Sequence, residues 1–213
     1  MVRVQSFVFS PLAENTYVLY DETGEAVIID PGCYDTRERA ELSGFIEQNK
    51  LKPGKLLNTH AHIDHILGNA FVKRQYEIEL YLHPADLPVL RSAPIMAPHF
   101  GIMTYEETDV DHFLEAGQRI SFGKSELEVR FVPGHAPGHV AFVNHADRFV
   151  IGGDVLFRGS IGRYDFPLSD YDTLIHSIRT QLYTLPDDYT VYPGHAQPTT
   201  IGHEKKNNPF VRL

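Results

Sequence analysis

Apolar and polar side chains alternate over residues 2–9, and β-type residues return over 16–20 and 25–30. Alternation with a period of two places one face of a strand on a core, so these segments predict a short antiparallel sheet. A turn at 21–24 joins the second segment to the third. Asp30-Pro31-Gly32 ends the third strand, because proline cannot donate to the hydrogen-bond ladder.

The pattern then changes to helical spacing. Leu42, Phe45 and Ile46 recur among charged residues, which predicts a helix over 35–49 with Asp35 or Thr36 as its cap. The next predicted elements are a buried strand at 56–57, a loop over 58–65, a helix over 66–75, a strand over 79–82 and a short helix over 84–90. Residues 91–108 show no clean period, and we interpret them as a functional loop insertion.

The second half repeats this plan loosely. Strands are predicted at 119–122, 126–132, 140–144, 148–151 and 190–192, a helix at 172–182, and a terminal helix from about Thr199. Strands and helices in this order suggest two α/β halves that face each other across a pair of sheets. No linker-like stretch separates the halves, so we expect a single domain over residues 1–213.

Composition narrows the class of protein. The 213 residues are 42% hydrophobic and 22% charged, which favours a packed core over a disordered chain. No apolar run approaches a membrane span, and the first ten residues do not resemble a signal peptide. The single cysteine, Cys33, excludes an internal disulfide framework, and the net charge of -9 disfavours a phosphate-backbone partner. We therefore expect a cytoplasmic protein that binds neither membrane nor nucleic acid.

Histidine is unusually abundant, with 12 residues in the chain. His60, His62, Asp64 and His65 follow the predicted buried strand directly. Alternate positions of an extended loop point the same way, so His60 and His62 can face one metal ion. Asp64 and His65 can turn toward a second ion as the chain enters its helix. Because zinc takes nitrogen and oxygen ligands, this spacing predicts a metal centre.

The same segment resembles the H-x-H-x-D-H motif of the metallo-β-lactamase superfamily. Four further segments match this family in order: Asp30-Pro31-Gly32, residues 133–139 around His135, Gly153-Asp154, and Pro193-Gly194-His195. The resemblance implies the α/β fold class and a four-layer αββα sandwich, formed by one metallo-β-lactamase-like domain over 1–213.

By this resemblance two divalent metal ions are bound, zinc being the first expectation and iron or manganese the alternatives. His60, His62 and His135 would hold the first ion. Asp64, His65 and His195 would hold the second, and Asp154 would bridge the two. Asp64 and Asp154 are the expected catalytic residues.

The other histidines are not expected to bind metal. His139 is expected to support its loop rather than to bind metal, and Asp30 has a similar supporting role. The histidines that match no motif are expected on the surface or satisfied by neighbours: His83, His99, His112, His145, His176 and His203.

Within the superfamily, residues 153–166 and 199–210 are similar to short members of the hydroxyacylglutathione hydrolase (glyoxalase II) group. This implies hydrolysis of a small-molecule thioester such as S-lactoylglutathione by a hydroxide that bridges two ions about 3.5–4 Å apart. Full-length members hold glutathione with a helical C-terminal domain, so glutathione recognition does not carry over to this chain. Arg158, Arg163, Lys205 and Lys206 are candidate anion contacts, with solvated surface charge as the alternative.

Two other functions stay open at this point. The Gly162-Arg163-Tyr164-Asp165-Phe166 stretch is also similar to iron persulfide dioxygenases, which use one iron on the positions of His60, His135 and Asp154. The fold can also serve as a metal-binding module without turnover, since fold does not fix function.

Overall fold

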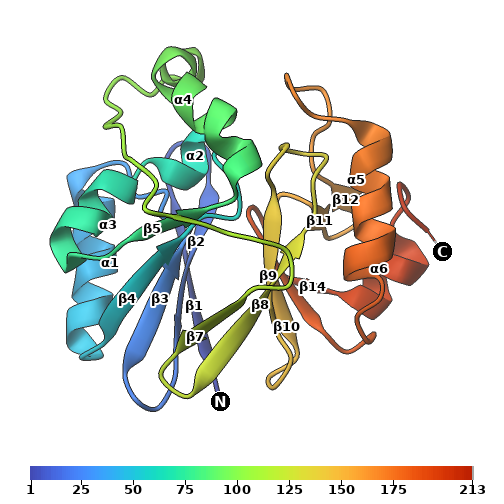
Figure 1. Ribbon diagram of the computed structural model, residues 1–213, viewed down its shortest axis with the longest axis horizontal. Coiled ribbons are helices and arrows are strands. Elements are labelled where there is room, and N and C mark those ends of the chain that lie inside the picture. Colours follow the sequence, from blue (N-terminus) through green and yellow to red (C-terminus); the bar gives the residue numbers. More distant parts are fainter. Residues whose placement is uncertain (213) are drawn as a thin grey trace.

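The computed structural model describes residues 1–212 and shows a four-layer αββα sandwich. Two mixed β-sheets face each other at the centre (Figure 1). Helices α1 and α3 cover the outer face of the first sheet, and α5 and α6 lie outside the second. The predicted fold class and the pairing of two α/β halves are therefore confirmed.

The first sheet has the order β1-β2-β3-β4-β5-β6. Strands β1 to β3 pair antiparallel, and β3 to β6 pair parallel. The strands are β1 Arg3–Phe9, β2 Glu14–Tyr20, β3 Glu25–Ile29, β4 Lys52–Leu57, β5 Leu80–Leu82 and β6 His112–Phe113. The change from antiparallel to parallel pairing follows the insertion of α1 between β3 and β4, since a parallel partner needs a crossover connection.

The second sheet has the order β14-β13-β10-β9-β8-β7. Only β10 and β13 pair parallel among the described strands of this sheet. Its strands are β7 Arg119–Phe122, β8 Ser125–Phe131, β9 Val140–Asn144, β10 Phe149–Gly153, β13 Thr190–Pro193 and β14 Thr199–Thr200. Strands β11 Leu156–Phe157 and β12 Ser160–Ile161 form a separate hairpin.

The helices begin where the local chemistry allows. Helix α1 has a capping box, in which Asp35 accepts the N–H of Glu38 at 2.8 Å, so the structure selects Asp35 over Thr36 as the cap. The helices and helical turns are α1 Thr36–Gln48, α2 Ile63–Ile66, α3 Asn69–Tyr76, η1 Pro84–Asp86, α4 Leu87–Met96, η2 Ala97–Phe100, α5 Tyr171–Ser177, η3 Ile178–Leu182 and α6 Ile201–Asn207.

Alternation along the strands sorts the apolar side chains into layers. Leu19, Val27 and Leu57 of the first sheet pack with Val129 and Phe142 of the second, between the two sheets. The other faces of the same strands pack against helices: Val18, Ile28 and Leu56 lie with Leu42 and Ile46 of α1. Both faces of each sheet are thus buried, which explains why β3 is continuously apolar from Ala26 to Ile29.

Two expectations about local structure are wrong. Residues 91–96 continue helix α4 and 97–100 form a 3-10 helix, so only the part from Gly101 onward is the loop expected over 91–108. Pro94 lies inside α4, where the apolar face of Leu90, Ala93 and Ala97 packs on α2 and outweighs the broken helical hydrogen bond. The loop expected over 58–65 also ends early, because α2 begins at Ile63.

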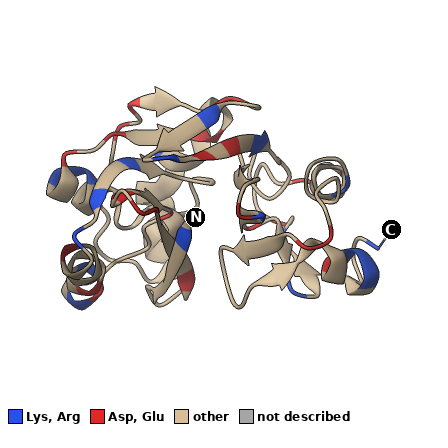
Figure 2. Cartoon of the chain, turned by 90° about the horizontal axis from the view of Figure 1, so that it is seen from below, with Lys and Arg blue, Asp and Glu red and all other residues tan. Residues whose placement is uncertain are grey.

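Surface charge is mixed over the molecule. Figure 2 shows Lys and Arg interspersed with Asp and Glu along the helices and near the strand ends. Within residues 1–212, no helix has the length and apolar character that crossing a membrane requires.

Candidate metal centre

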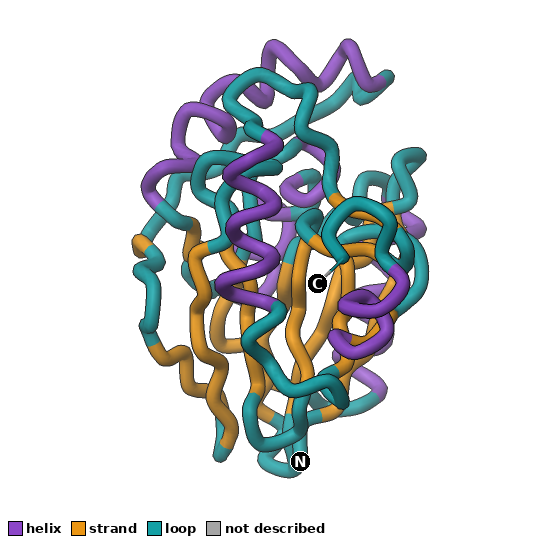
Figure 3. The backbone as a smooth tube through the Cα atoms, turned by 90° about the vertical axis from the view of Figure 1, so that its right-hand side faces the viewer, coloured by secondary structure: helices purple, strands orange, loops and turns teal. Residues whose placement is uncertain are grey.

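The predicted site residues lie at one edge of the sandwich, beyond the carboxyl ends of strands from both sheets. His60 and His62 follow β4 of the first sheet, whereas His135, Asp154 and His195 follow β8, β10 and β13 of the second. Figure 3 shows the strands side by side, with loops and short helices gathered above this edge. Because β8, β10 and β13 run in the same direction, their ends meet at one place.

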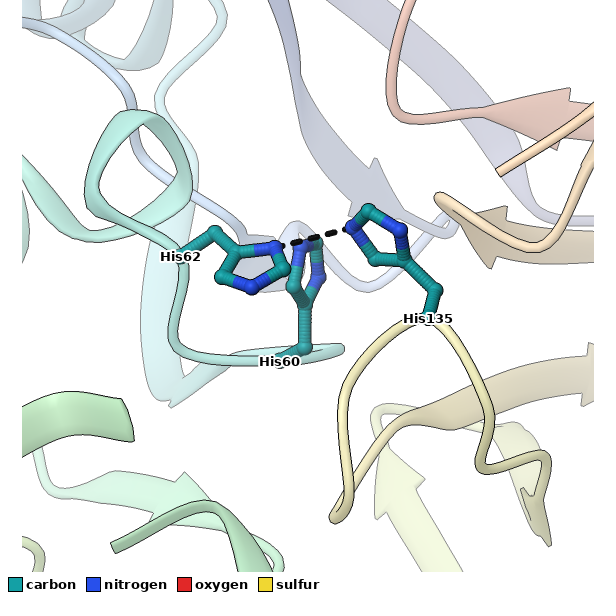
Figure 4. Close-up of side chains that lie close together, drawn as sticks. All are labelled: His60, His62 and His135. Atoms are coloured by element: carbon teal, nitrogen blue, oxygen red, sulfur yellow. Dashed lines mark hydrogen bonds between the residues drawn. The ribbon is translucent and has the colours of Figure 1, made fainter. Parts of the chain in front are cut away.

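The structure brings His60, His62 and His135 together as one group. One nitrogen from each ring lies within 4.8 Å of the others, a spacing that a single metal ion can span. Figure 4 shows the three rings converging, with His62 Nδ1 2.8 Å from His135 Nε2. His60 is completely buried and His135 almost so.

Asp64, His65 and His195 form a second group with the same property. Asp64 Oδ2 lies 3.0 Å from His195 Nε2 and 3.7 Å from His65 Nε2. All seven residues singled out by the sequence therefore come to one edge of the fold, although they are spread over more than half of the chain.

Asp154 lies between the two groups. Its Oδ2 is 3.6 Å from His135 Nε2 of the first group and 3.5 Å from His195 Nε2 of the second. Its other oxygen, Oδ1, is 3.5 Å from His65 Nε2. A single carboxylate thus faces nitrogens of both groups, which is the placement a bridging ligand requires.

Hydrogen bonds at the far side of four rings fix which nitrogen faces the centre. His135 Nδ1 donates to the carbonyl of Arg163 at 2.8 Å, and His195 Nδ1 donates to the carbonyl of Ala13 at 3.0 Å. A carbonyl only accepts, so Nδ1 of each ring carries a proton and Nε2 is the nitrogen that faces the cluster, with a lone pair for a metal ion when the ring is neutral.

Asp30 and Thr59 orient the other two rings. The Thr59 hydroxyl donates to Asp30 at 2.6 Å, so the same oxygen accepts from His60 Nδ1 at 3.0 Å. His65 Nδ1 donates to Asp30 Oδ2 at 3.1 Å. Asp30 also lies near His60 and His65 in a third group with ligand spacing, but its oxygens already accept from Thr59, Asn58 and His65. Asp30 therefore has the supporting role expected from the sequence.

The chemistry of these atoms fits metal ions. Among residues 1–212, His60 Nε2, His65 Nε2 and Asp154 Oδ1 are buried and have no hydrogen-bond partner. A buried polar atom left without a partner costs about 1–3 kcal/mol, so three of them at one point need a ligand to offset that cost. The cluster is able to bind metal ions, which such lone pairs would coordinate.

Burial keeps the rings of the first group neutral. It lowers the pKa of His62 to about 3, with the neighbouring His135 acting in the same direction. Burial also lowers the pKa of His135 and holds that of His60 well below its ordinary value. Neutral imidazole is the form that binds metal, so these three rings need no deprotonation first.

The second group is different because of its carboxylates. Burial alone would lower the pKa of His65, but Asp64 and Asp154 outweigh it and raise that pKa well above its ordinary value. The pKa of His195 is raised as well, against burial, by its hydrogen bond to Asp64 and by Asp154. The same attraction lowers the pKa of Asp64 and of Asp154, so both carboxyls are ionised at neutral pH.

His139 acts through Asp154. Its Nε2 accepts the backbone N–H of Asp154 at 3.0 Å, and its ring stacks on that of His60. Gly153 just before Asp154 has a φ of +51°, and a Cβ there would lie 2.5 Å from Thr59 Oγ1. Only glycine lets the chain turn at this point and carry the aspartate into the cluster.

Two buried acids were missed by the sequence analysis. Asp86 accepts the N–H groups of Ala61 and Gly138, and burial raises its pKa to about 6. Glu14 is fully buried with Oε1 4.0 Å from His65 Nδ1, and burial raises its pKa well above the ordinary value. Neither stands in a local pattern that distinguishes it from a surface acid, so no signal in the sequence could have found them.

The histidines outside the motifs lie away from the cluster. His145 lies between Glu128 and Tyr189, and His112 contacts Glu79. His83 stacks on Phe131, and His99, His176 and His203 are exposed. These placements agree with the expectation that they are satisfied by neighbours or solvated.

A cavity of about 770 Å³ opens beside the cluster. His62, Asp64, His135, Asp154 and His195 line it, so all but His60 and His65 of the seven predicted residues face its space. Such a volume is typical of a site for a small organic ligand.

Comparison with known proteins agrees with this geometry. Residues 10–195 match the metallo-beta-lactamase superfamily. The chain is 38% identical over 212 residues to hydroxyacylglutathione hydrolase GloC from Haemophilus influenzae, a match that covers 99% of this chain and 98% of that protein.

Two solved structures are also closely similar. The BLEG-1 B3 metallo-beta-lactamase superposes with a TM-score of 0.90 at 33% identity, covering 98% of this chain and 99% of that one. TTHA1623 in a di-iron-bound form superposes with a TM-score of 0.87 at 39% identity, and the match covers 98% of this chain and 100% of that one.

Proposed function

This chain belongs to the metallo-beta-lactamase superfamily, and from that premise we propose that it is a metal-dependent hydrolase that cleaves a thioester such as S-lactoylglutathione. It is a metallo-hydrolase of this superfamily. The observation that carries the proposal is the position of Asp154 Oδ2, between His135 of one group and His195 of the other. The relation to GloC supports the thioester as the bond that is cleaved.

The proposed ligands follow from the two groups. His60, His62 and His135 would hold one divalent cation, and Asp64, His65 and His195 would hold a second. Asp154 would bind both. Zinc fits this nitrogen and oxygen set, and the di-iron form of TTHA1623 makes iron a second candidate.

When bound, two such cations would supply an activated water as the nucleophile and polarise the thioester carbonyl. The chain's own residues do the rest. Asp64 and Asp154 face the cavity in ionised form, so they would bind the cations and accept a hydrogen bond from the attacking water, whose proton passes to solvent. Asp30, Thr59 and the two backbone carbonyls keep the imidazoles fixed, so that the centre is preorganised. A thiolate leaves without protonation, so the mechanism requires no separate acid.

The reducing cytoplasm is the compartment that we propose, since the one cysteine, Cys33, is a buried free thiol rather than part of a disulfide. Cys33 lies in the apolar layer between the first sheet and α1, so it takes no part in the proposed chemistry.

The test combines metal analysis with turnover. The purified protein is expected to contain two equivalents of metal and to hydrolyse S-lactoylglutathione, with activity lost to a chelator and restored by zinc. One equivalent of iron together with oxygen uptake on a glutathione persulfide would instead identify a dioxygenase. Bound metal with no turnover of either substrate would leave a metal-binding module and contradict the proposal.

A further inference from the structure

Two separate segments of the chain give the cavity apolar walls. One wall comes from α4 and η2, through Val89, Ala93, Met96 and Phe100. The other comes from the segment between β12 and α5, through Phe166 and Leu168. Phe100 and Val89 rest on the buried cluster beneath α4, so the first wall has a packed support. The part of the lining that the His and Asp cluster provides is called the floor here, and it consists of His62, Asp64, His135, Asp154 and His195.

Two arginines line the same cavity, but their charges are not equally available. Arg163 forms a bidentate pair with Asp165 at 2.9 and 3.0 Å, and its guanidinium lies 4.0 Å from the centre of the Phe166 ring. Arg158 is exposed and has no hydrogen bond or ion pair within the part of the chain that the structure describes, residues 1–212. The guanidinium of Arg158 is therefore available to an anionic ligand in the cavity.

We propose that the cavity selects a thioester with an apolar acyl group several carbons long, seated against α4 and η2, and an anionic carrier thiol near Arg158. This substrate class rests on the proposed thioester hydrolysis. The scissile carbonyl would lie over the cluster at the floor, with the acyl chain on one side and the carrier on the other.

Chemistry assigns the two ends in this way. Carrier thiols such as glutathione bear carboxylates, and an ionised group placed against Val89, Met96 and Phe100 would lose its hydration without a partner. The carrier therefore lies at the exposed side with Arg158. An acyl chain has no polar atom beyond its carbonyl, so burying it gains free energy in proportion to its area. A lactoyl group has three carbons and carries a hydroxyl, so it offers little apolar area to the wall formed by α4 and η2.

The first test measures binding without turnover. The zinc-loaded protein is titrated calorimetrically with S-methyl-, S-butyl- and S-hexylglutathione, thioethers that cannot be hydrolysed. Affinity is expected to rise about fourfold for each methylene that becomes buried, with a negative heat-capacity change. An S-hexyl compound that binds no more than about twofold tighter than the S-methyl compound would overturn the proposal, since ~0.8 kcal/mol per methylene predicts far more.

Variants locate the acyl chain. Met96→Gln keeps the length of the side chain but makes the wall polar, so the affinity for S-hexylglutathione is expected to fall about tenfold, with the S-methyl compound unaffected. Met103→Gln is the matched control, because Met103 is 80% exposed and does not line the cavity. Equal effects of the two substitutions on S-hexylglutathione would contradict seating against α4.

A second pair of variants locates the carrier. Arg158→Gln is expected to lower the affinity for S-hexylglutathione about threefold, by an amount that depends on salt concentration. The affinity for the neutral S-hexyl-N-acetylcysteamine is expected to stay unchanged. Arg179→Gln, an exposed arginine on η3, is the control. If Arg158→Gln lowers the affinity for both ligands equally, or for neither, the role of Arg158 is refuted.

The outcomes separate this inference from the proposed function. Chain-length-dependent binding without hydrolysis of any acyl thioester would support the apolar subsite and contradict thioester hydrolysis. Hydrolysis of S-lactoylglutathione together with flat binding across the thioether series would support the hydrolase and refute the apolar subsite.

Discussion

The carboxylate of Asp86 accepts the backbone N–H of Gly138 through Oδ1 at 2.6 Å. Its other oxygen accepts the N–H of Ala61, also at 2.6 Å, and the side chain is completely buried. Ala61 lies between His60 and His62, and Gly138 lies three residues after His135. One buried carboxylate thus joins the two loops that carry the first metal group.

Asp86→Asn is expected to loosen that junction. An amide offers one acceptor where the carboxylate offers two, so one buried N–H loses its partner at a cost of about 1–3 kcal/mol in the free energy of unfolding. Urea unfolding measures this loss, and chelator competition is expected to show weaker metal binding. The same change at Asp170, an exposed cap of α5 where asparagine serves equally well, is the control. Equal stability of the two variants would show that Asp86 does not hold the two loops together.

Asp154→Ala removes the carboxylate that faces both groups. Thioester hydrolysis is expected to fall by more than about 100-fold with the chain still folded, since even the loss of a ligand's supporting partner costs 10- to 100-fold. The measurements are kcat, metal content and a thermal unfolding curve. His176→Ala, on the exposed side of α5, is expected to change activity less than about twofold. Retained activity in Asp154→Ala would argue against a shared ligand.

Gly194→Ala tests the close approach of backbone and cluster. A Cβ at this position would lie 2.1 Å from Asp154 Oδ1 and 2.7 Å from His65 Cε1, so the second group must shift. We expect the variant to keep one metal equivalent and to lose the other, as measured by elemental analysis. Gly44→Ala in α1 meets no atom within 4 Å and is expected to stabilise the protein by about 0.5–1 kcal/mol. Two full equivalents in Gly194→Ala would show that the second group tolerates the displacement.

Metal uptake is expected to depend on pH in one group only. Burial lowers the pKa of His62 to about 3 and lowers those of His60 and His135, so these rings hold no proton near neutrality for a cation to displace. The pKa values of His65 and His195 are raised, so their protons are lost only at higher pH. A proton bound below the raised pKa competes with the cation, so binding of the second equivalent weakens as pH falls through these raised pKa values.

Calorimetric titration of the metal-free protein in buffers of different ionisation enthalpy measures this difference. The first equivalent is expected to release almost no protons and the second to release them. Equal proton release for the two equivalents would mean that the carboxylates of Asp64 and Asp154 do not distinguish the groups.

Local sequence patterns were sufficient to predict many of the strands and helices of the fold. The period-two run of β1, the β-type residues of β2 and the capped helix α1 are visible without tertiary context, because side-chain alternation, residue type and capping chemistry involve neighbours only. Helix α4 was missed beyond Leu90 for the opposite reason. Pro94 is a local signal against a helix, and the packing of Leu90 and Ala93 on α2 that outweighs it comes from residues distant in sequence.

For the site, a local pattern was enough to identify candidate ligands, since the spacing of His60, His62, Asp64 and His65 involves only neighbours in the chain. Which nitrogen of His135 and His195 faces the centre depends on long-range contacts, because the carbonyls of Arg163 and Ala13 come from other parts of the chain. Tertiary packing also raises the pKa of Asp86 and forms the apolar walls of the cavity. Desolvation and the choice of hydrogen-bond partner depend on what packs against a group, and a linear pattern does not contain that information.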